Sequence, residues 1–455
     1  MNNREECICA LATPAGGAIG IIRLSGNEAI AIADKIFVSA SGKKLVDIKA
    51  NTVVYGEVKD SECNTIDDVM VSIFRAPHSY TGEDSVEISC HGSRYILQQV
   101  LQRLIEIGCR QAEPGEYTRR AYMNGKMDLS QAEAVADLIA STNRATHQMA
   151  LSQLKGHFSD QLVVLRNQLL KMTSLLELEL DFSDHEELEF ADRTELRALA
   201  EQIEHRITTL ANSFDTGNAI KQGIPVAIVG KTNVGKSTLL NRLLHEEKAI
   251  VSDIHGTTRD VIEDTAVISG ITFRFIDTAG IRKTDNVVEN IGIERTFKKI
   301  EEARIVIWLF DEPPTKEEQE KMAAKTYGKK LLYVLNKIDL SPRHYSNSTS
   351  TFLRISAQTG QNVEILEQSI VKCADVPAIT ENDVIVTSAR HYEALLHAHD
   401  DLSHVIESIE TELSGDFIAE DLKMVLDDLQ NITGKGRITP QETLNNIFRH
   451  FCIGK

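Results

Sequence analysis

The sequence predicts a chain of α/β and α class, with a small α+β domain at the N-terminus, a helical bundle, and a doubly wound α/β domain inserted into that bundle. Three patterns lead to this prediction. Apolar residues alternate in short segments over residues 1–120, and they recur at helical spacing in residues 129–214 and again in 395–429. Between the helical stretches, a β-branched strand at 226–229 runs through a glycine-rich loop into a helix.

The N-terminal domain, residues 1–120, is expected to be a compact α/β unit because its apolar segments are short and alternate with turn residues. Gly16, Gly17 and Gly20 precede a strand rather than open a helix, so a dinucleotide-binding fingerprint is not expected. Strands are predicted at residues 7–12, 19–24, 53–58, 69–74 and 85–90, and helices at 29–37 and 95–107.

The helical bundle is expected in two halves, residues 121–215 and 380–455, because long periodic stretches there contain few glycines. The acidic stretch 181–192 is interpreted as a solvated connection between helices, with a cation site as the alternative. A domain's termini usually lie close together at its surface, which permits an insertion between the two halves.

The inserted domain is expected at residues 218–375, as a mostly parallel sheet with helices between its strands. Ser269 and Gly270 stand between two apolar runs and indicate a hairpin. Strands are predicted at residues 226–229, 265–268, 272–276, 305–310 and 331–335.

A formal net charge of −18 over 455 residues argues against a protein whose affinity comes from broad neutralisation of phosphates, so any contact with nucleic acid is expected to be local. The seven cysteines include no C-x-x-C pair, and most are expected to be buried thiols in a reducing compartment. No apolar run is long enough for a membrane helix and no signal pattern opens the chain, so a cytoplasmic protein is expected.

Residues 230–237, GKTNVGKS, match the phosphate-binding pattern GxxxxGK[ST] between a strand and a helix. Its glycines let backbone N–H groups converge on phosphate oxygens, Lys236 adds a cation for the outer phosphates, and the Ser237 hydroxyl can ligate Mg²⁺. A turn of this composition can arise by chance, but its downstream context argues strongly against chance.

Three further stretches occur in the order that a Ras-like GTPase domain requires: 277–280 (DTAG), 336–339 (NKID) and 356–357 (SA). Asn336 can hydrogen-bond O6 and N7 of guanine, and Asp339 can accept from N1–H and from the exocyclic amino group that adenine lacks. Asp277 is suited to hold Mg²⁺ through water, and the Gly280 N–H is suited to contact the γ-phosphate.

Ile281 occupies the position directly after this glycine, where small GTPases of the Ras kind carry a glutamine that orients water. An aliphatic side chain cannot orient water, so the candidates for that role are a cation near the phosphates and a carboxylate from residues 282–290. Between the phosphate loop and the hairpin, Thr257 and Thr258 are candidate switch residues, one of which would reach Mg²⁺.

Six more motifs are distributed over the chain, at residues 13–23, 80–87, 114–118, 124–129, 256–260 and 451–455. Together they make the chain resemble the MnmE (TrmE) family of bacterial and organellar tRNA modification GTPases over essentially its whole length. The last motif, Cys-Ile-Gly-Lys after Phe451, is highly specific and does not fit a prenylation signal.

The resemblance implies a reaction. With the flavoprotein MnmG, which brings FAD, the family adds an aminomethyl or carboxymethylaminomethyl group at C5 of the wobble uridine, position 34, of certain tRNAs. The one-carbon unit comes from a tetrahydrofolate derivative, 5-formyl or 5,10-methylene. The resemblance also implies a homodimer through the N-terminal domain and a heterotetramer or larger complex with MnmG. By motif position, the folate site would contain Arg23, Glu87, Lys126 and Lys455.

The resemblance further implies that K⁺ beside the phosphates is the catalytic cation, held by Asn233, Ser252, Ile254 and Thr257. Mg²⁺ would be held by Ser237 and Thr258, and Glu289 would be the catalytic carboxylate that orients water. The residues expected to contact GTP are Asn233, Val234, Gly235, Lys236, Ser237, Thr238, Ser252, Asp253, Ile254, His255, Gly256, Thr257, Thr258, Asp277, Thr278, Ala279, Gly280, Asn336, Lys337, Asp339, Ser356 and Ala357.

Two other functions share the nucleotide motifs. A ribosome-assembly GTPase, acting as an RNA-binding checkpoint, would have the same phosphate loop and an apolar residue after DTAG, but such proteins usually carry a basic domain that this acidic chain lacks. A signalling switch with an external activating protein is the third hypothesis. Folate binding by the N-terminal domain would separate the first function from these two.

Overall fold

The computed structural model describes residues 6–181, 193–245, 264–276, 300–340, 352–377, 380, 382–434, 441–449, 451, 452 and 454. The chain divides into two compact units. One contains Met1–Ile139, Gln153–Leu196 and His404–Lys455, and the other contains Ala140–Ser152 and Arg197–Ser403. Helices α7 (Arg193–Gln222) and α13 (Ala389–Glu410) each pass from one unit into the other.

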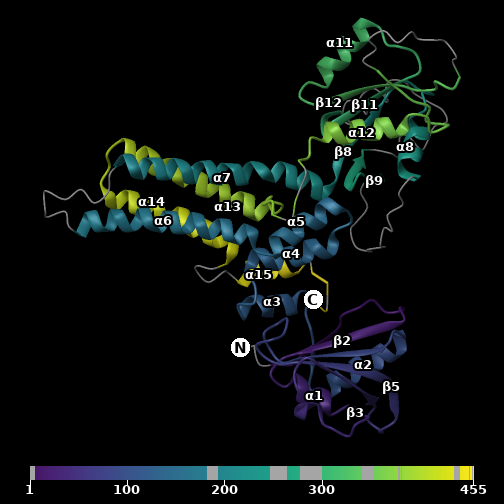
Figure 1. The fold of residues 1–455 in the computed structure, drawn as a ribbon, viewed down its shortest axis with the longest axis vertical. Helices are drawn as coiled ribbons and strands as arrows, with labels where there is room; N and C mark the ends of the chain where they lie inside the picture. The colour runs from purple at the N-terminus through teal and green to yellow at the C-terminus, as the bar shows by residue number, and fades with distance from the viewer. Residues whose placement is uncertain are drawn as a thin grey trace. The chain divides into compact units, whose positions relative to one another are not determined.

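A seven-stranded sheet forms the N-terminal domain of the first unit (Figure 1). Its strand order is β3-β4-β5-β6-β2-β1-β7, and only the pair β1–β7 is parallel. The strands are β1 (Ile8–Leu11), β2 (Ile19–Ser25), β3 (Phe37–Ser39), β4 (Thr52–Lys59), β5 (Thr65–Phe74), β6 (Ser85–His91) and β7 (Arg110–Gln111).

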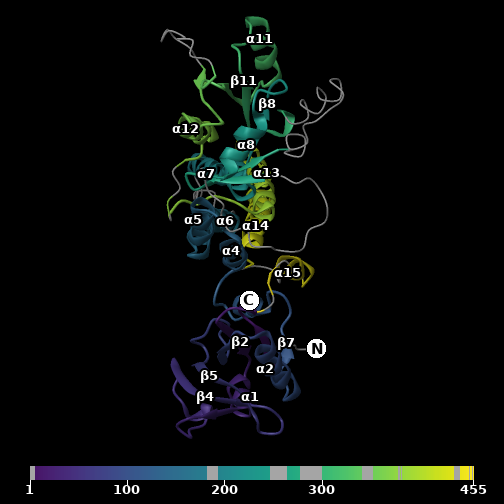
Figure 2. The same ribbon diagram turned by 90° about the vertical axis from the view of Figure 1, so that its right-hand side faces the viewer.

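Helices α1 (Ala29–Asp34) and α2 (Arg94–Glu106) lie on the same face of this sheet (Figure 2). Because side chains alternate along a strand, Ile22 and Leu24 of β2 pack toward these helices, and Arg23 projects from the other face. On that other face, Tyr117 of α3 (Glu116–Met123) packs with Ile8 and Ala10 of β1.

The remaining helices of the first unit are α4 (Leu129–Ala140), α6 (His157–Asp181), α14 (Gly415–Thr433) and α15 (Gln441–Phe448). Helix α14 packs against α6 and buries Leu422, Val425 and Leu429, a spacing of three and four residues that is typical of one helix face. Phe448 and Phe451 pack with Leu129 of α4.

A six-stranded sheet forms the predicted inserted domain, in the second unit, in the order β13-β12-β11-β8-β10-β9. Neighbouring strands are parallel except for the pair β9–β10. The elements are β8 (Ile224–Val229), α8 (Lys236–His245), β9 (Asp264–Ile268), β10 (Ile271–Phe275), β11 (Ile305–Phe310), α11 (Lys316–Lys325), β12 (Lys330–Leu335), β13 (Leu353–Arg354) and α12 (Val363–Ala374).

Strand β11 is buried on both faces, which makes this sheet doubly wound. Ile305, Ile307 and Leu309 pack in one core cluster with residues of α8 and α12. Trp308 and its alternate neighbours pack in a second cluster, to which Met322 of α11 belongs. A continuous apolar run is typical of a parallel strand that helices cover on both sides, so the predicted fold class is confirmed.

The hairpin predicted at Ser269 and Gly270 is confirmed, because both residues have positive φ angles, 52° and 78°, as a tight two-residue β-turn requires. Next to it, Asn143 donates from Nδ2 to the Thr272 hydroxyl at 2.7 Å, and Ala145 N–H donates to the Gly270 carbonyl at 3.4 Å. These bonds join the start of α5 (Arg144–Leu154) to the inserted domain.

All ten predicted strands are present, and three short ones were missed. Strands β3, β7 and β13 span three, two and two residues, which is too short for an alternating pattern to show. The predicted helix at 29–37 was too long, because Phe37 belongs to β3 and packs in the sheet core. None of the helices in the described part of the chain combines the length and apolar character that crossing a membrane requires.

Candidate functional site

The phosphate loop connects β8 to α8, as the sequence predicts, and two glycines allow its close approach to neighbouring strands. A Cβ on Gly230 would lie 2.2 Å from the Leu309 carbonyl oxygen, and a Cβ on Gly235 would lie 2.4 Å from Asn336 Nδ2. Gly235 also has a φ of 96°, in the region that side chains disfavour. Neither position can therefore accept a larger residue without displacing β11 or the Asn336 side chain.

Lys236 places a cation at the centre of the loop. Its Nζ donates to the carbonyl oxygens of Gly230 and Lys231, at 2.8 and 2.6 Å. Lys236 is also the first residue of α8, so its charge lies beside the N–H groups at the helix N-terminus. Ser237 and Thr238 follow in the first turn, and together these groups provide a site for an anion such as a phosphate.

Asn336, predicted to bind the base, is also the residue that joins the loops of this site. It follows β12 and is only 4% exposed. Its Nδ2 donates to the Val234 carbonyl at 2.8 Å, and its Oδ1 accepts from the Ala357 N–H at 2.9 Å. The amide thus ties together the phosphate loop, the NKID stretch and the SA stretch.

The rest of the NKID stretch is more open. Lys337 has a φ of 61°, and its Nζ forms an ion pair with Asp311 Oδ2 at 3.0 Å. Asp339 is exposed, so its carboxylate is accessible to a ligand. The arrangement leaves an acceptor at the surface beside the buried amide of Asn336, as the proposed guanine contacts require.

The SA stretch is held by a bond of Ser356 itself and by Arg242, a residue that no sequence motif predicts. Ser356 is buried and its hydroxyl accepts from the Thr359 N–H at 3.1 Å. Arg242 of α8 donates to the carbonyl of Ala357 at 3.4 Å and to that of Gln358 at 2.7 Å. No sequence motif contains Arg242. Its place on α8 brings it to this stretch, whose Ala357 lies 115 residues away in sequence.

Many predicted site residues lie outside the described part of the chain. They are Ser252, Asp253, Ile254, His255, Gly256, Thr257, Thr258, Asp277, Thr278, Ala279, Gly280, Glu289 and Lys455. Most of the acidic stretch 181–192 also lies outside it. Among the described residues, no group of three or more His, Cys, Asp and Glu side chains is arranged to hold a metal ion.

In the N-terminal domain, Arg23 and Glu87 face each other across neighbouring strands. They are register partners in β2 and β6, with Nε and Nη2 of Arg23 at 2.8 and 2.7 Å from Glu87 Oε1. The Arg23 guanidinium also lies 5.8 Å from the ring centre of Tyr80 and 5.7 Å from that of Tyr117, and its Nη1 is 3.5 Å from the Gly454 carbonyl. The structure therefore brings Arg23, Glu87 and the C-terminal segment together.

Lys126, the third candidate for this site, contacts the loop that carries Tyr80. Its Nζ donates to the Pro77 carbonyl at 2.9 Å. The Tyr80 hydroxyl lies 2.8 Å from the Thr118 hydroxyl, and burial raises the pKa of Tyr80, so the phenol stays neutral at physiological pH. Tyr80 and Tyr117 both lie in motifs noted in the sequence, but nothing in the sequence showed that their rings flank Arg23.

A buried network of ion pairs joins α3 to the loop that carries Tyr80. Glu116, almost fully buried, accepts from Arg110 at 2.6 Å and from Arg120 at 3.1 Å. Arg120 also pairs with Glu83 at 3.1 Å, in the loop that carries Tyr80. Burial alone would raise the pKa of Glu116, but its bonds to Arg110 and to the Glu113 N–H, with the charge of Arg120, hold that pKa below its ordinary value.

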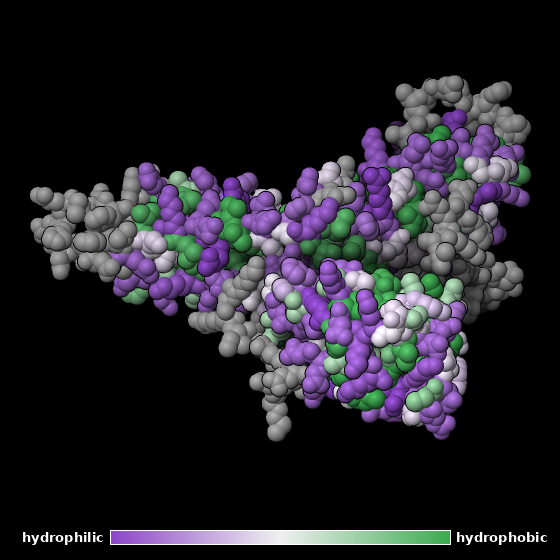
Figure 3. Space-filling model, turned by 60° about the horizontal axis from the view of Figure 1, so that its bottom comes forward, coloured by the Kyte–Doolittle hydropathy of each residue, from purple (hydrophilic) through white to green (hydrophobic). Residues whose placement is uncertain are grey.

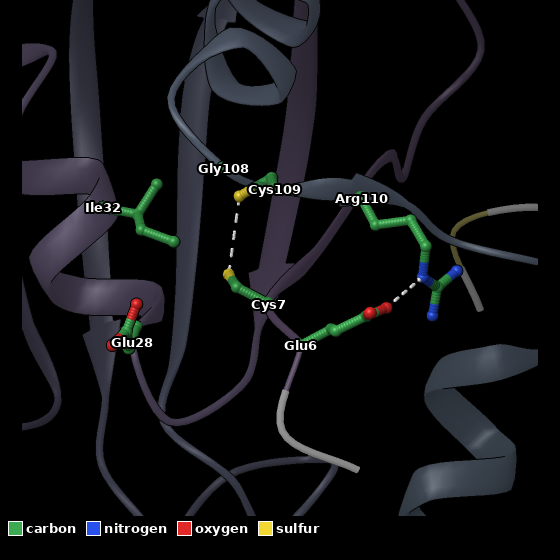
Figure 4. A pocket seen from close by; sticks show the side chains of 7 residues that line it. All are labelled: Glu6, Cys7, Glu28, Ile32, Gly108, Cys109 and Arg110. Atoms are coloured by element: carbon green, nitrogen blue, oxygen red, sulfur yellow. Dashed lines mark hydrogen bonds and ion pairs between the residues drawn. The ribbon is translucent and has the colours of Figure 1, made fainter. Parts of the chain in front are cut away.

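Four of the seven cysteines are buried, which confirms the prediction that most of them are buried. Cys7, Cys9, Cys90 and Cys109 are buried, Cys63 and Cys452 are exposed, and burial raises the pKa of Cys90 to about 12. A pocket of about 300 Å³ is lined by Cys7 and Cys109, whose sulfur atoms are 3.4 Å apart and point toward one another (Figure 4). Its hydrogen bond with Cys109 and its burial raise the pKa of Cys7, so these thiols are poor nucleophiles.

The face of the N-terminal sheet without α1 and α2 carries exposed apolar side chains. Tyr55 and Met70 are register partners in β4 and β5 and are 53% and 48% exposed, and Val53 and Val38 lie on the same face. Arg23 lies on the same face, because register partners on neighbouring strands share a face of the sheet. Val53 is the partner of Ser72, Ser72 is the partner of Glu87, and Glu87 is the partner of Arg23. Figure 3, with this domain toward the viewer, shows hydrophobic side chains gathered in patches on its surface.

Comparison with known protein families gives two matches. Residues 7–126 match the model described as GTP-binding protein TrmE N-terminus, and residues 129–452 match the MnmE helical domain. Curated relatives named tRNA modification GTPase MnmE align along nearly their whole length. The protein of Phocaeicola vulgatus is 52% identical, covering 99% of each chain, and that of Bacteroides fragilis is 54% identical, covering 99% of this chain and 100% of its own.

Proposed function

Because the chain belongs to the MnmE family of tRNA modification GTPases, we propose that it couples GTP hydrolysis to modification at C5 of the wobble uridine, position 34, in certain tRNAs. The chain is a GTP hydrolase that acts in tRNA modification. In this proposal MnmG is the partner that supplies FAD, and a tetrahydrofolate derivative supplies the one-carbon unit. The family match over the N-terminal domain favours this function over a ribosome-assembly checkpoint.

The observation that carries the nucleotide half of the proposal is the position of Asn336. Its buried amide holds the phosphate loop and the SA stretch, while the exposed Asp339 follows three residues later. A purine that offers donors to Asp339 would complete this site. Adenine would leave the carboxylate without a partner, which costs binding energy and selects guanine.

Hydrolysis needs a substitute for the glutamine that Ile281 replaces. Asn233 has a φ of 63° and an exposed side chain that makes no hydrogen bond to any described residue, so its amide oxygen is available to a cation. When bound beside the phosphates, K⁺ supplies positive charge where negative charge develops in the transition state. Ser252, Ile254 and Thr257 would complete its ligands.

Three further residues would complete the catalytic centre. Glu289 would orient the attacking water, as a carboxylate within hydrogen-bond reach of it can do. Ser237, in the first turn of α8, and Thr258 would hold Mg²⁺ through hydroxyl oxygens, which are the hard ligands that this ion prefers.

The pair Arg23–Glu87 supports a folate site in the N-terminal domain. A guanidinium and a carboxylate presented side by side suit a ligand that has both a carboxylate tail and amide-like donors. Both groups are about a quarter exposed, so they remain accessible to such a ligand. Lys126 and Lys455 would add the remaining positive charge.

We further propose that the chain forms a homodimer through the apolar face of the N-terminal sheet. Val38, Val53, Tyr55 and Met70 are each about half exposed on three neighbouring strands, β3, β4 and β5. Contiguous apolar surface of this kind is typical of a protein contact. The complex with MnmG, a heterotetramer or larger, would then act on tRNA in the cytoplasm.

The proposal is tested by mass spectrometry of tRNA nucleosides from cells with and without the gene. Loss of the C5-modified wobble uridine in the deletion strain, restored by the wild-type chain and not by Lys236→Ala, is the expected result. Lys231→Ala is a matched control, because Lys231 lies in the same loop but its Nζ pairs with Glu318 at the surface. A deletion strain with unchanged wobble nucleosides would overturn the proposal.

A further inference from the structure

The surface between α11 and β12 carries lysines in an otherwise acidic chain. Residues 321–330 contain four lysines and no acidic residue, against a net charge of −18 for the whole sequence. They comprise the last turn of α11, a tight turn, and the first residue of β12. This position is at the end of the sheet opposite the phosphate loop, because the loop follows the carboxyl end of β8 and Lys330 stands at the amino end of β12, parallel to it.

Tyr327 stands out from this turn into solvent. Its side chain is 90% exposed, although the backbone around it is well fixed. The Thr326 hydroxyl donates to the Met322 carbonyl at 2.9 Å, the Lys329 N–H donates to the Thr326 carbonyl at 2.9 Å, and Gly328 has a φ of 78°. The fold therefore fixes the backbone that carries this aromatic ring, and the ring itself extends into solvent.

Two exposed lysines lie at the same end of the sheet as this turn. Lys330 is exposed at the start of β12, and Lys372 is exposed in the last turn of α12. Both lie near Cys373, where their positive charges oppose the burial that raises the pKa of this thiol. The nearby acids Glu301, Glu302 and Asp375 limit the positive patch to a few side chains, so it can meet only a few phosphates.

We propose that this lysine–tyrosine surface, defined as Tyr327, Lys330 and Lys372, binds unpaired nucleotides of the tRNA substrate. Lysines bind phosphate groups, and an exposed tyrosine ring stacks on a base that is not paired. An acidic protein segment would use the lysines but would have no need of a free ring. The inference rests on the proposed function for the identity of the RNA, and it accounts for local RNA contact by an acidic chain.

The test measures the affinity of the intact chain for fluorescently labelled tRNA by anisotropy, at several KCl concentrations. Tyr327→Ala changes no charge and is expected to weaken binding by about fivefold or more, because stacking on one base is lost. Lys330→Gln with Lys372→Gln is expected to lower the slope of log affinity against log salt by about one to two, one for each phosphate contact removed. Tyr95→Ala, at a ring that is 70% exposed on α2, and Lys43→Gln are matched controls that are expected to bind as the wild type does.

Rates of GTP hydrolysis without tRNA show that each variant is folded and are expected to be unchanged. The proposal is overturned if Tyr327→Ala binds tRNA with wild-type affinity or if the control variants weaken tRNA binding equally. It is also overturned if the variants keep their affinity for tRNA and lose only their binding to the flavoprotein partner. Normal wobble modification in a deletion strain would instead contradict the proposed function, so the two failures are distinguishable.

Discussion

Asn336 and Val234 are 102 residues apart in sequence, and the Asn336 amide donates to the Val234 carbonyl at 2.8 Å. The same side chain accepts from the Ala357 N–H, so one buried amide positions both the phosphate side and the base side of the nucleotide site. Because this side chain fixes the loops and, in our proposal, also recognises the base, nucleotide binding is expected to be sensitive to small changes at this point.

Asn336→Ala should therefore reduce both stability and nucleotide affinity. Removing the amide leaves a buried carbonyl and a buried N–H without partners, at a cost of about 1–3 kcal/mol each. We expect the affinity for GDP, measured with a fluorescent analogue, to fall at least tenfold and the melting temperature of the chain to fall as well. Gln319→Ala removes an amide-to-carbonyl bond at α11, far from the loop in sequence, and should change neither quantity appreciably.

Gly235→Ala should abolish nucleotide binding while the rest of the chain stays folded. The added methyl group would lie 2.4 Å from Asn336 Nδ2 at a φ of 96°, so both a clash and backbone strain oppose it. Gly42→Ala introduces backbone strain without a clash, because Gly42 has a φ of 71° and open space around its Cβ, so this variant separates the two effects. If Gly235→Ala bound nucleotide as the wild type does, the described loop geometry would be wrong.

Tyr80 should contribute to folate binding through Arg23. Tyr80→Ala removes a ring beside the guanidinium, a contact worth about 0.5–2 kcal/mol, so the affinity for 5-formyltetrahydrofolate should fall about two- to thirtyfold in a calorimetric titration. Tyr80→Phe keeps the ring and loses only the bond to Thr118, and should bind nearly as the wild type does. Equal affinities for all three proteins would show that Tyr80 does not position Arg23.

Glu116 should stabilise the N-terminal domain in a pH-dependent way. Its pKa is lower in the folded chain than in the unfolded one, so its contribution is present above the unfolded value of about 4.3 and is lost as the pH falls through the folded value. Glu116→Gln should cost about 2–3 kcal/mol at pH 7, and the difference from the wild type should shrink below about pH 4.

Scanning calorimetry at pH 7 and at pH 3.5 measures this difference. Glu113→Gln is the control, because Glu113 pairs with Arg119 at the surface and is 55% exposed, and such pairs contribute little. A difference between wild type and Glu116→Gln that stays constant with pH would contradict the described network.

Much of the fold could be predicted from residue patterns alone. The run Ile305–Phe310 is apolar throughout because β11 is covered on both faces, and such runs are visible in sequence. The end of α1 could not be predicted, because an apolar residue such as Phe37 fits the buried face of either a helix or a strand. Its pairing with Val58 shows that it belongs to a strand. The hydrophobic pattern of one stretch does not show which distant strand that stretch pairs with.

The same limit applies to the site. The motifs identified Lys236, Asn336 and Asp339 because phosphate and guanine chemistry needs those groups at those spacings. They did not identify Arg242, which contacts the site through hydrogen bonds to the backbone of the SA stretch. Likewise, Tyr117 flanks Arg23 and donates from its hydroxyl to the Arg23 carbonyl at 2.7 Å across 94 residues, a contact that depends on tertiary structure.

The central claim is that a monovalent cation and a loop carboxylate replace the missing glutamine in GTP hydrolysis. The most direct test is the steady-state rate of phosphate release from GTP by the intact chain, in KCl and in NaCl of equal ionic strength. We expect a clearly faster rate in KCl, which Glu289→Ala lowers while GTP binding is retained. Equal rates in the two salts would contradict it.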